Sequence, residues 1–160
     1  KSIVSVLSSH KRKGLEDFIR IANSSEFNDY ELTVISQENL RLPEHVTLIK
    51  PSTDKEYLKA LLKSSFFLSL SKFEVFSLPP LEAMSLGLVV IAYPNEGIIS
   101  YCNQKNSILS LLDDTFELNQ IIEKLLSQPD NYKKLSIESL RTARKYNKLG
   151  FQNKFYKLIQ

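Results

Sequence analysis

Short apolar runs alternate along this chain with longer stretches in which apolar residues recur every three or four positions. The first pattern predicts β-strands and the second predicts amphipathic helices. Six runs predict strands, at residues 2–7, 30–36, 46–49, 66–70, 88–92 and 107–112. Helical spacing predicts helices at residues 15–22, 78–86, 115–126, 132–146 and 151–159, and one that follows the turn at 51–54 and includes residues 57–62, with one further helical turn within 93–101.

Strands and helices alternate through most of the chain, which is the order expected of an α/β fold with a parallel sheet. The runs at 66–70 and 88–92 are apolar except for Ser69, as is typical of parallel strands buried on both faces. We therefore predict a Rossmann-like, doubly wound parallel sheet of about six strands in the order 3-2-1-4-5-6, with C-terminal helices. Ligands of such sheets bind beyond the carboxyl ends of the strands, here at the loops 8–14, 50–54, 71–78 and 93–100.

Apolar residues at helical spacing are expected to face the sheet. In the second predicted helix these residues are Tyr57, Leu58, Leu61 and Leu62. In the helix that starts near residue 115 they are Phe116, Leu118, Ile121, Ile122, Leu125 and Leu126. Pro129 is expected to break the helical run, because proline lacks a backbone N–H.

Composition narrows the class of protein without selecting a partner. The chain has 160 residues, 42% of them hydrophobic and 24% charged, which fits one globular domain over residues 1–160. The net charge of +3 is too small to favour a partner, and no apolar run approaches a membrane span of roughly 20 residues. One cysteine and two histidines exclude an internal disulfide and a metal-ligand pattern. The chain starts without Met and almost within a strand, which suggests a fragment of a longer protein.

The strand-to-helix turn within residues 70–91 concentrates the candidate chemistry. It contains no glycine-rich phosphate loop. Two prolines, at 79 and 80, open the helix without a backbone N–H, so the amides open to an anion are those of Phe76, Ser77 and Leu78. Together with the positive end of the helix dipole, these amides predict a phosphate site.

Two acidic residues flank this turn eight positions apart, Glu74 before it and Glu82 within the helix. A carboxylate is unsuited to phosphate, but it accepts hydrogen bonds from pairs of hydroxyls. A phosphate site beside two hydroxyl-binding carboxylates describes a site for a nucleotide sugar.

The same stretch carries a family motif. Its pattern is Ser71-x-x-Glu-x-Phe-x-Leu-Pro-Pro-Leu-Glu-Ala-Met-x-x-Gly-x-Val-Val, which contains an E-x7-E element. It resembles the donor-binding segment of the retaining glycosyltransferases of family four (glycosyl transferases group 1), which have the GT-B fold. Lys13 and Gly14, between the first strand and the first helix, resemble the lysine-glycine element of that family. The resemblance covers essentially the whole chain and implies a C-terminal donor-binding domain.

The resemblance implies a role for each matched residue. Lys13 would contact the donor diphosphate, and Glu74 would face the hydroxyls of the transferred sugar near the reaction centre. The amides of residues 76–78 would meet the phosphates or the sugar, and Glu82 would bind the ribose. The loop at 50–52 lies where the base would sit.

The implied reaction is transfer of a sugar from a UDP- or GDP-sugar to a hydroxyl acceptor with retention, without a metal or other cofactor. The acceptor, a saccharide or lipid-linked saccharide, would bind an N-terminal domain that this chain lacks, so the chain alone is expected to be inactive. The implied setting is polysaccharide or glycolipid biosynthesis in the cytoplasm, with the full-length enzyme attached peripherally to the inner face of the membrane.

The family's arginine, five or six positions before the lysine, falls here on Leu7 or Ser8, so one phosphate partner is missing unless Lys11 or Arg12 replaces it. The chain also departs from the family pattern at two further loops. Val75 and Ser77 stand where the family often has glycine, so the loop must form without glycine's freedom in φ. The family's Gly-Gly-x-x-Glu element after the fifth strand appears as residues 96–100, which keep only Gly97. Donor contacts from that second loop are not carried over.

Two other interpretations stay open at the level of sequence. The same fold could form half of a GT-B epimerase or phosphorylase. Alternatively, the Lys11-Arg12-Lys13 cluster could make the chain a non-catalytic module that binds nucleic acid or anionic lipid. No aromatic residues are interleaved with that cluster, so nucleic acid is not a predicted partner.

Overall fold

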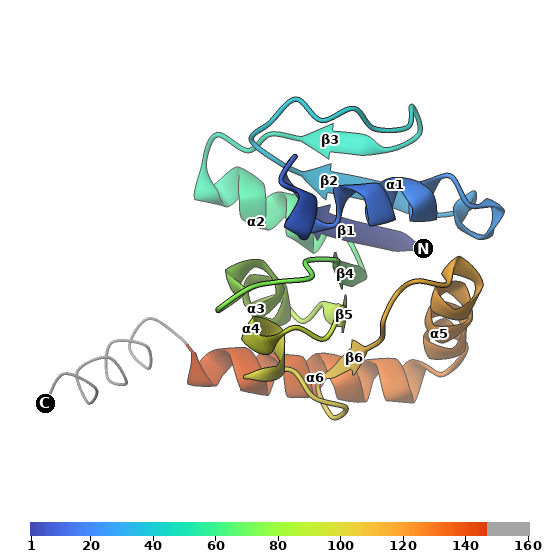
Figure 1. The fold of residues 1–160 in the computed structure, drawn as a ribbon. Coiled ribbons are helices and arrows are strands. Elements are labelled where there is room, and N and C mark those ends of the chain that lie inside the picture. Colours follow the sequence, from blue (N-terminus) through green and yellow to red (C-terminus); the bar gives the residue numbers. More distant parts are fainter. Residues whose placement is uncertain (147–160) are drawn as a thin grey trace, which may run out of the picture.

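The computed structural model describes residues 1–146, in which six strands form one parallel sheet (Figure 1). The strand order is β3-β2-β1-β4-β5-β6, which confirms the predicted topology. The strands are β1 (Ser2–Val6), β2 (Glu31–Ile35), β3 (Thr47–Ile49), β4 (Phe66–Ser69), β5 (Val89–Ala92) and β6 (Ser107–Leu109). The helix predicted at residues 151–159 lies outside the described part of the chain.

Strand β1 lies inside the sheet, between β2 and β4. Its residue Ile3 pairs with Leu32 of β2 on one side and with Phe66 of β4 on the other. The strand order therefore reverses direction between β1 and β4. Ligands of doubly wound sheets bind at such a reversal, beyond the carboxyl ends of the strands.

Within residues 1–146, six α-helices and two 3₁₀ turns connect or follow the strands. The helices are α1 (Leu15–Ala22), α2 (Asp54–Leu62), α3 (Leu78–Ser85), α4 (Glu96–Ile99), α5 (Thr115–Ser127) and α6 (Pro129–Lys145), and the turns are Lys11–Lys13 and Ser25–Phe27. The side chains of Thr53, Asn95 and Asp114 begin α2, α4 and α5 by accepting hydrogen bonds from first-turn amides. None of the described helices is both long and apolar enough to cross a membrane.

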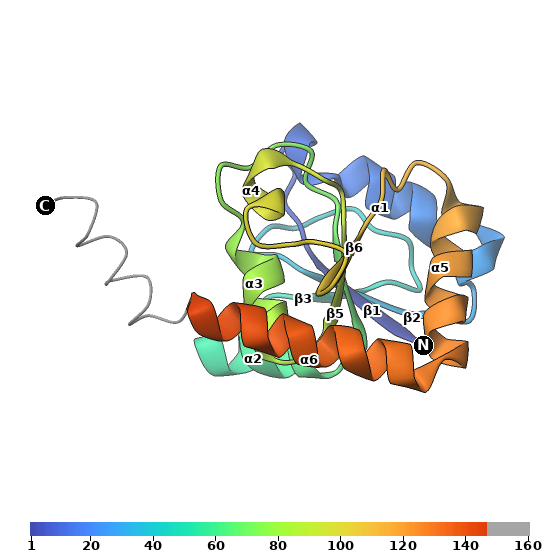
Figure 2. The same cartoon turned by 90° about the horizontal axis from the view of Figure 1, so that it is seen from below.

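Helices cover both faces of the sheet (Figure 2). Neighbouring residues along a strand belong to different buried clusters, one in each layer. Along β5, Val89 and Ile91 pack in the layer covered by α1 and α5, whereas Val90 and Ala92 pack in the layer covered by α2 and α3. Every residue of β4 and β5 is buried. This confirms the prediction made from their apolar runs.

The apolar stripe of two helices is wider than the face that meets the sheet. The side chains wrongly predicted to face the sheet are Leu58, Leu62, Phe116 and Leu126, all of them at least 36% exposed. Helix α2 packs on the sheet through Leu61, as predicted, and through Ala60. Spacing alone overestimates the buried face, because neighbouring elements decide how much of a stripe is covered.

Two predicted boundaries also differ. Pro129 begins α6 rather than breaking a helical run, because the first helical turn has no use for its missing N–H. The last strand ends at Leu109, and Leu112 beyond it has a φ of 60°. Arg20 donates to the carbonyl oxygens of Leu112 and Asp113, each at 2.8 Å, and so holds this turn against α1.

The loop between β1 and α1 passes closest to the end of β4 at Gly14. This residue has a φ of +77°. A Cβ built on it would lie 2.4 Å from the Cβ of Leu70 and 2.5 Å from the carbonyl oxygen of Leu70. Backbone conformation and space therefore both require glycine here.

The variant Gly14→Ala should lower the free energy of unfolding by at least about 3 kcal/mol, because the cost of a positive φ and the cost of overpacking add. Gly87→Ala is the matched control: Gly87 has a φ of +80°, but the nearest atom to its built Cβ is the Ser136 hydroxyl at 3.2 Å. The control should lose only about 1–2 kcal/mol. Urea unfolding, monitored by circular dichroism, measures the free energy of unfolding of both variants. Equal losses of stability in the two variants would contradict the contact with Leu70.

Candidate functional site

Hydrogen bonds join three loops at the carboxyl ends of β1, β4 and β5. The amide of Lys72 donates to the carbonyl oxygen of Arg12 at 2.9 Å, which links the β4–α3 loop to the β1–α1 loop. The side-chain amide of Asn95 donates to the carbonyl oxygen of Ser71 at 2.6 Å, which links the β5–α4 loop to the β4–α3 loop. These are three of the four loops at which the sequence predicts ligand binding.

Lys13 and Glu74 form an ion pair in which Lys13 Nζ donates to Glu74 Oε1. The hydroxyl of Ser71 lies 3.0 Å from the same carboxylate oxygen. The Glu74 side chain is 18% exposed, so the pair is partly shielded from water. Lys11 and Arg12 are exposed, so of the three cationic residues in this cluster it is Lys13 that reaches the predicted site.

The start of α3 presents backbone amides as the sequence predicts. Ser77 precedes the helix in an extended conformation and makes no side-chain cap. Within residues 1–146, the structure records no hydrogen bond from the amides of Ser77 and Leu78. Pro79 and Pro80 follow at the first helical positions and have no amide to offer. Two amides at the positive end of the helix dipole are therefore available to an anion.

The loop before α3 keeps its shape without glycine. None of residues 71–77 has a positive φ, so Val75 and Ser77 fit where the family often has glycine. The hydroxyl of Tyr101 donates to the carbonyl oxygen of Ser77 at 2.6 Å, and both residues are buried. The ring of Phe76 lies 5.6 Å from that of Tyr101, which makes its side chain a packing group. The role of the Phe76 amide stays a prediction.

Helix α4 supports the loop that carries Glu74. A Cβ built on Gly97 would lie 2.6 Å from the carbonyl oxygen of Glu74, so the two backbones touch. Asn95 accepts from the amide of Ile98 at 3.0 Å while its own side-chain amide holds Ser71. The sequence indicated Gly97 only as a remnant of a donor-binding element, and the structure gives it a contact with the Glu74 loop.

Glu82 lies one turn into α3 and accepts a hydrogen bond from the hydroxyl of Tyr57 in α2, with the two oxygens 2.6 Å apart. Burial and this hydrogen bond raise the pKa of Tyr57, so the hydroxyl stays protonated and donates. Sequence analysis treated Tyr57 as a core residue only. No local signal relates positions 57 and 82, because they lie on different helices.

Two adjoining cavities, which we call the strand-end groove, follow the carboxyl ends of the strands. One, of about 100 Å³, is lined by the ion pair, Ser77 and both prolines. The other, of about 340 Å³, is lined by Gln37, Pro51 and Tyr57. Residues 6–8 line both cavities, so the two lie side by side across the end of β1.

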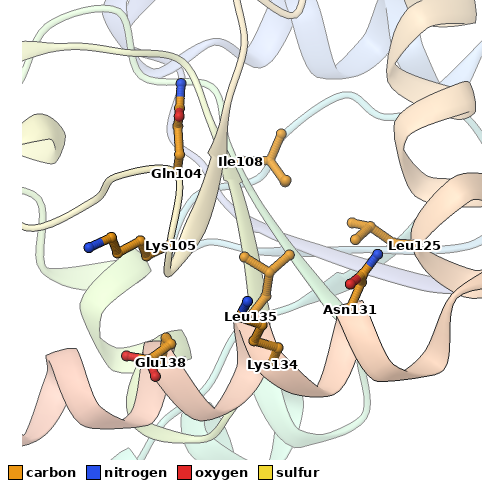
Figure 3. Close-up of a pocket in the computed structure, with 8 residues that line it drawn as sticks. All are labelled: Gln104, Lys105, Ile108, Leu125, Asn131, Lys134, Leu135 and Glu138. Atoms are coloured by element: carbon orange, nitrogen blue, oxygen red, sulfur yellow. The ribbon is translucent and has the colours of Figure 1, made fainter.

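A larger cavity, of about 680 Å³, lies at the opposite end of the strands (Figure 3). Its apolar lining comes from Ile108 of β6, Leu125 of α5 and Leu135 of α6, next to Lys105, which precedes β6. This position is the amino end of an edge strand, away from every predicted site residue. Over the described range 1–146, no three or more His, Cys, Asp or Glu side chains gather in a way that could hold a metal ion.

Comparison of sequences gives two findings. A family model described as glycosyl transferases group 1 matches residues 1–142. Over 66 residues the chain is 44% identical to a protein provisionally named glycosyltransferase 41 from the Sulfolobus islandicus filamentous virus (isolate Iceland/Hveragerdi). That stretch covers 41% of this chain and 19% of the viral protein.

Three solved structures share the fold. Sucrose-phosphate synthase from Thermosynechococcus elongatus superposes with a TM-score of 0.77 at 20% identity, over 99% of this chain and 45% of that one. Anabaena HepE, in complex with UDP and glucose, superposes with a TM-score of 0.78 at 16% identity, over 98% of this chain and 47% of HepE. The third structure is the C-terminal domain of the glycosyl transferase group 1 family protein LpcC from Francisella tularensis. It superposes with a TM-score of 0.69 at 19% identity, over 90% of this chain and 84% of the LpcC domain. This chain thus spans less than half of the viral protein, the synthase and HepE.

The variant Gly97→Ala should lower the free energy of unfolding by about 1–3 kcal/mol, because a methyl group would press on the Glu74 carbonyl. Helix propensity alone predicts the opposite sign, since alanine is favoured over glycine by about 1 kcal/mol within a helix. Glu96→Ala, at an exposed neighbouring position of α4, should change stability by no more than about 0.5 kcal/mol. Urea unfolding measures both variants, and a more stable Gly97→Ala protein would refute the contact.

Proposed function

The chain belongs to the glycosyl transferases group 1 family and corresponds to the C-terminal domain of such proteins, and we propose that it binds a nucleotide diphosphate sugar as the donor for sugar transfer. The strand-end groove is the proposed donor site. The sugar moves from the donor to a hydroxyl of the acceptor, with retention at the anomeric carbon. Retention follows from the resemblance of the Glu74–Glu82 stretch to the retaining family.

One observation carries the proposal: the groups that line or adjoin the groove match the parts of such a donor. The apolar cavity at Pro51 suits the base, and Glu82 beside it suits the ribose hydroxyls. The start of α3 and Lys13 suit the diphosphate, and Glu74 beside Lys13 suits the sugar. HepE, which has the same fold and was solved with UDP and glucose, supports this class of ligand.

Lys13 exchanges partners when the donor binds. In the unliganded protein its ammonium group neutralises Glu74. A diphosphate offers that ammonium group more negative charge than one carboxylate does. The exchange leaves Glu74, still within reach of the Ser71 hydroxyl, to accept hydrogen bonds from the sugar.

The chemical step breaks the bond between the anomeric carbon and the diphosphate oxygen. It forms a bond between the same carbon and the acceptor hydroxyl oxygen, whose proton passes to the leaving diphosphate. Negative charge then develops on the diphosphate, and positive charge develops on the anomeric carbon. Lys13 and the amides of Ser77 and Leu78 stabilise the leaving diphosphate, because they are donors held in place before the charge forms. Glu74 lies on the sugar side, where a carboxylate favours the positive charge. No metal ion is assigned a role.

The acceptor, a hydroxyl of a saccharide or lipid-linked saccharide, binds a second domain in this proposal. Phe73, Val75 and Leu78 are 53%, 84% and 53% exposed on and just beyond the β4–α3 loop, and they offer an apolar rim for that domain to cover. The setting proposed is polysaccharide or glycolipid biosynthesis at the cytoplasmic face of a membrane.

Removal of the Lys13 charge should weaken binding of a nucleoside diphosphate. Titration calorimetry with UDP and GDP should give an affinity about 10- to 100-fold lower for Lys13→Met than for the unmodified chain, since a charge-assisted hydrogen bond is lost. Lys11→Met removes an equal charge from the exposed neighbour and should change affinity by no more than about twofold. Equal losses in the two variants would indicate a general effect of charge and contradict the proposed role of Lys13.

The two carboxylates should respond differently to a diphosphate that carries no sugar. Glu82→Gln should weaken binding of UDP or GDP by about tenfold, because it removes the charged acceptor for ribose. Glu74→Gln should leave that binding equal or tighter, because it frees Lys13 for the diphosphate. The same calorimetry measures both affinities. If Glu74→Gln lowered the affinity as much as Glu82→Gln does, the assignment of Glu74 to the sugar would be contradicted.

A further inference from the structure

We propose that Tyr57 is a positioning residue for the donor site, which holds the Glu82 carboxylate in place for the ribose and so sets the preference for ribose hydroxyls. This inference rests on the proposed function. Tyr57 has no counterpart in the motif residues from which that function was argued. It enters through its contact with Glu82 and its place in the lining of the groove.

The contact gives the carboxylate one fixed oxygen and one available oxygen. Tyr57 donates to Oε2 of Glu82 at 2.6 Å, a short hydrogen bond to a charged acceptor. Within residues 1–146, the structure records no hydrogen bond to Oε1 of Glu82. The oxygen without a protein partner is the one left for a ligand hydroxyl.

Both residues of the pair are anchored to rigid elements. Tyr57 lies in α2 between the Thr53 cap and the buried pair Ala60 and Leu61. Glu82 lies in α3 between the buried residues Leu81 and Ala83. An isolated glutamate side chain would rotate about three bonds, and each ordered rotor carries an entropic cost on binding. Tyr57 removes most of that freedom before the ligand arrives.

Tyr57 also links the ribose to the base. Its side chain lines the cavity of about 340 Å³ that also contains Gln37 and Pro51. The hydroxyl at the end of the same side chain reaches Glu82 in the next helix. The ring therefore forms part of the base cavity while the hydroxyl sets the acceptor for the sugar attached to that base. A ligand that lacks a ribose hydroxyl would leave Glu82 unsatisfied, which is the basis of discrimination at polar sites.

The test is a double-mutant cycle in the full chain of residues 1–160, read by calorimetry with whichever of UDP and GDP binds more tightly. The variants are Tyr57→Phe, Glu82→Ala and the double variant. Tyr57→Phe alone should weaken binding by about three- to tenfold, less than the loss of a ligand's own hydrogen bond to a charged group, because only the positioning of Glu82 is lost. On the Glu82→Ala background the same change should have an effect below about twofold, since the two residues act as one unit.

A second measurement compares the diphosphate with its 2′-deoxy and 3′-deoxy analogues. The unmodified chain should prefer the ribose form over at least one analogue by about tenfold, and Tyr57→Phe should reduce that preference to about threefold or less. Tyr132→Phe is the matched control, because Tyr132 donates through its hydroxyl to Ser65 at 2.9 Å, outside the groove. It should bind every nucleotide as the unmodified chain does.

Three outcomes are distinguishable. Binding of neither UDP nor GDP by the unmodified chain overturns the proposed function and this inference with it. Normal binding together with a Tyr57→Phe variant that behaves like Tyr132→Phe overturns the inference alone. The inference is also overturned if Tyr57→Phe lowers the affinity as much on the Glu82→Ala background as it does alone. Tyr57 would then act through the base cavity and not through Glu82.

Discussion

The whole site depends on one contact between two stretches of backbone. Gly14 and Leu70 approach so closely that no side chain fits at position 14, and the amide of Lys72 then reaches the carbonyl oxygen of Arg12. This contact brings Lys13, from the loop after the first strand, beside Glu74, from the loop after the fourth. The two charges did not create the approach, because a partly exposed ion pair contributes little stability. The pair is a consequence of the backbone contact.

Buried hydrogen bonds then take the place of glycine in shaping the loop before α3. Asn95 holds Ser71, Tyr101 holds Ser77, and Gly97 leaves room for the carbonyl of Glu74. Within the described chain, no buried side-chain nitrogen or oxygen lacks a hydrogen-bond partner. Since an unpaired buried polar group is costly, this satisfied network favours a single arrangement of the loop. It explains how Val75 and Ser77 are tolerated where greater backbone freedom is common.

The two carboxylates, Glu74 in the groove and Glu82 beside it, are held by donors of different kinds. Glu74 is paired with a lysine, whose flexible and charged side chain can move to a stronger anion. Glu82 is paired with a tyrosine, which is neutral, has few rotatable bonds and offers no charge to a phosphate. The first arrangement suits exchange on ligand binding, and the second suits a fixed acceptor. This physical difference agrees with the separate roles proposed for the two acids.

The pattern of apolar residues was enough to predict six strands and most helix positions, because each element is defined by contacts along its own length. The turn around Glu74 and Glu82 could be predicted for the same reason, since its residues lie within one strand–loop–helix unit. The strand order was predicted as the usual order of doubly wound sheets, which the structure confirms. Contacts between side chains of different elements could not be predicted from the sequence. Spacing could not relate Tyr57 to Glu82 or Gly97 to Glu74, and it placed Leu58 in the core although α2 turns it to solvent. Such pairings exist only after the sheet has brought distant strand ends together, so tertiary structure alone decided them.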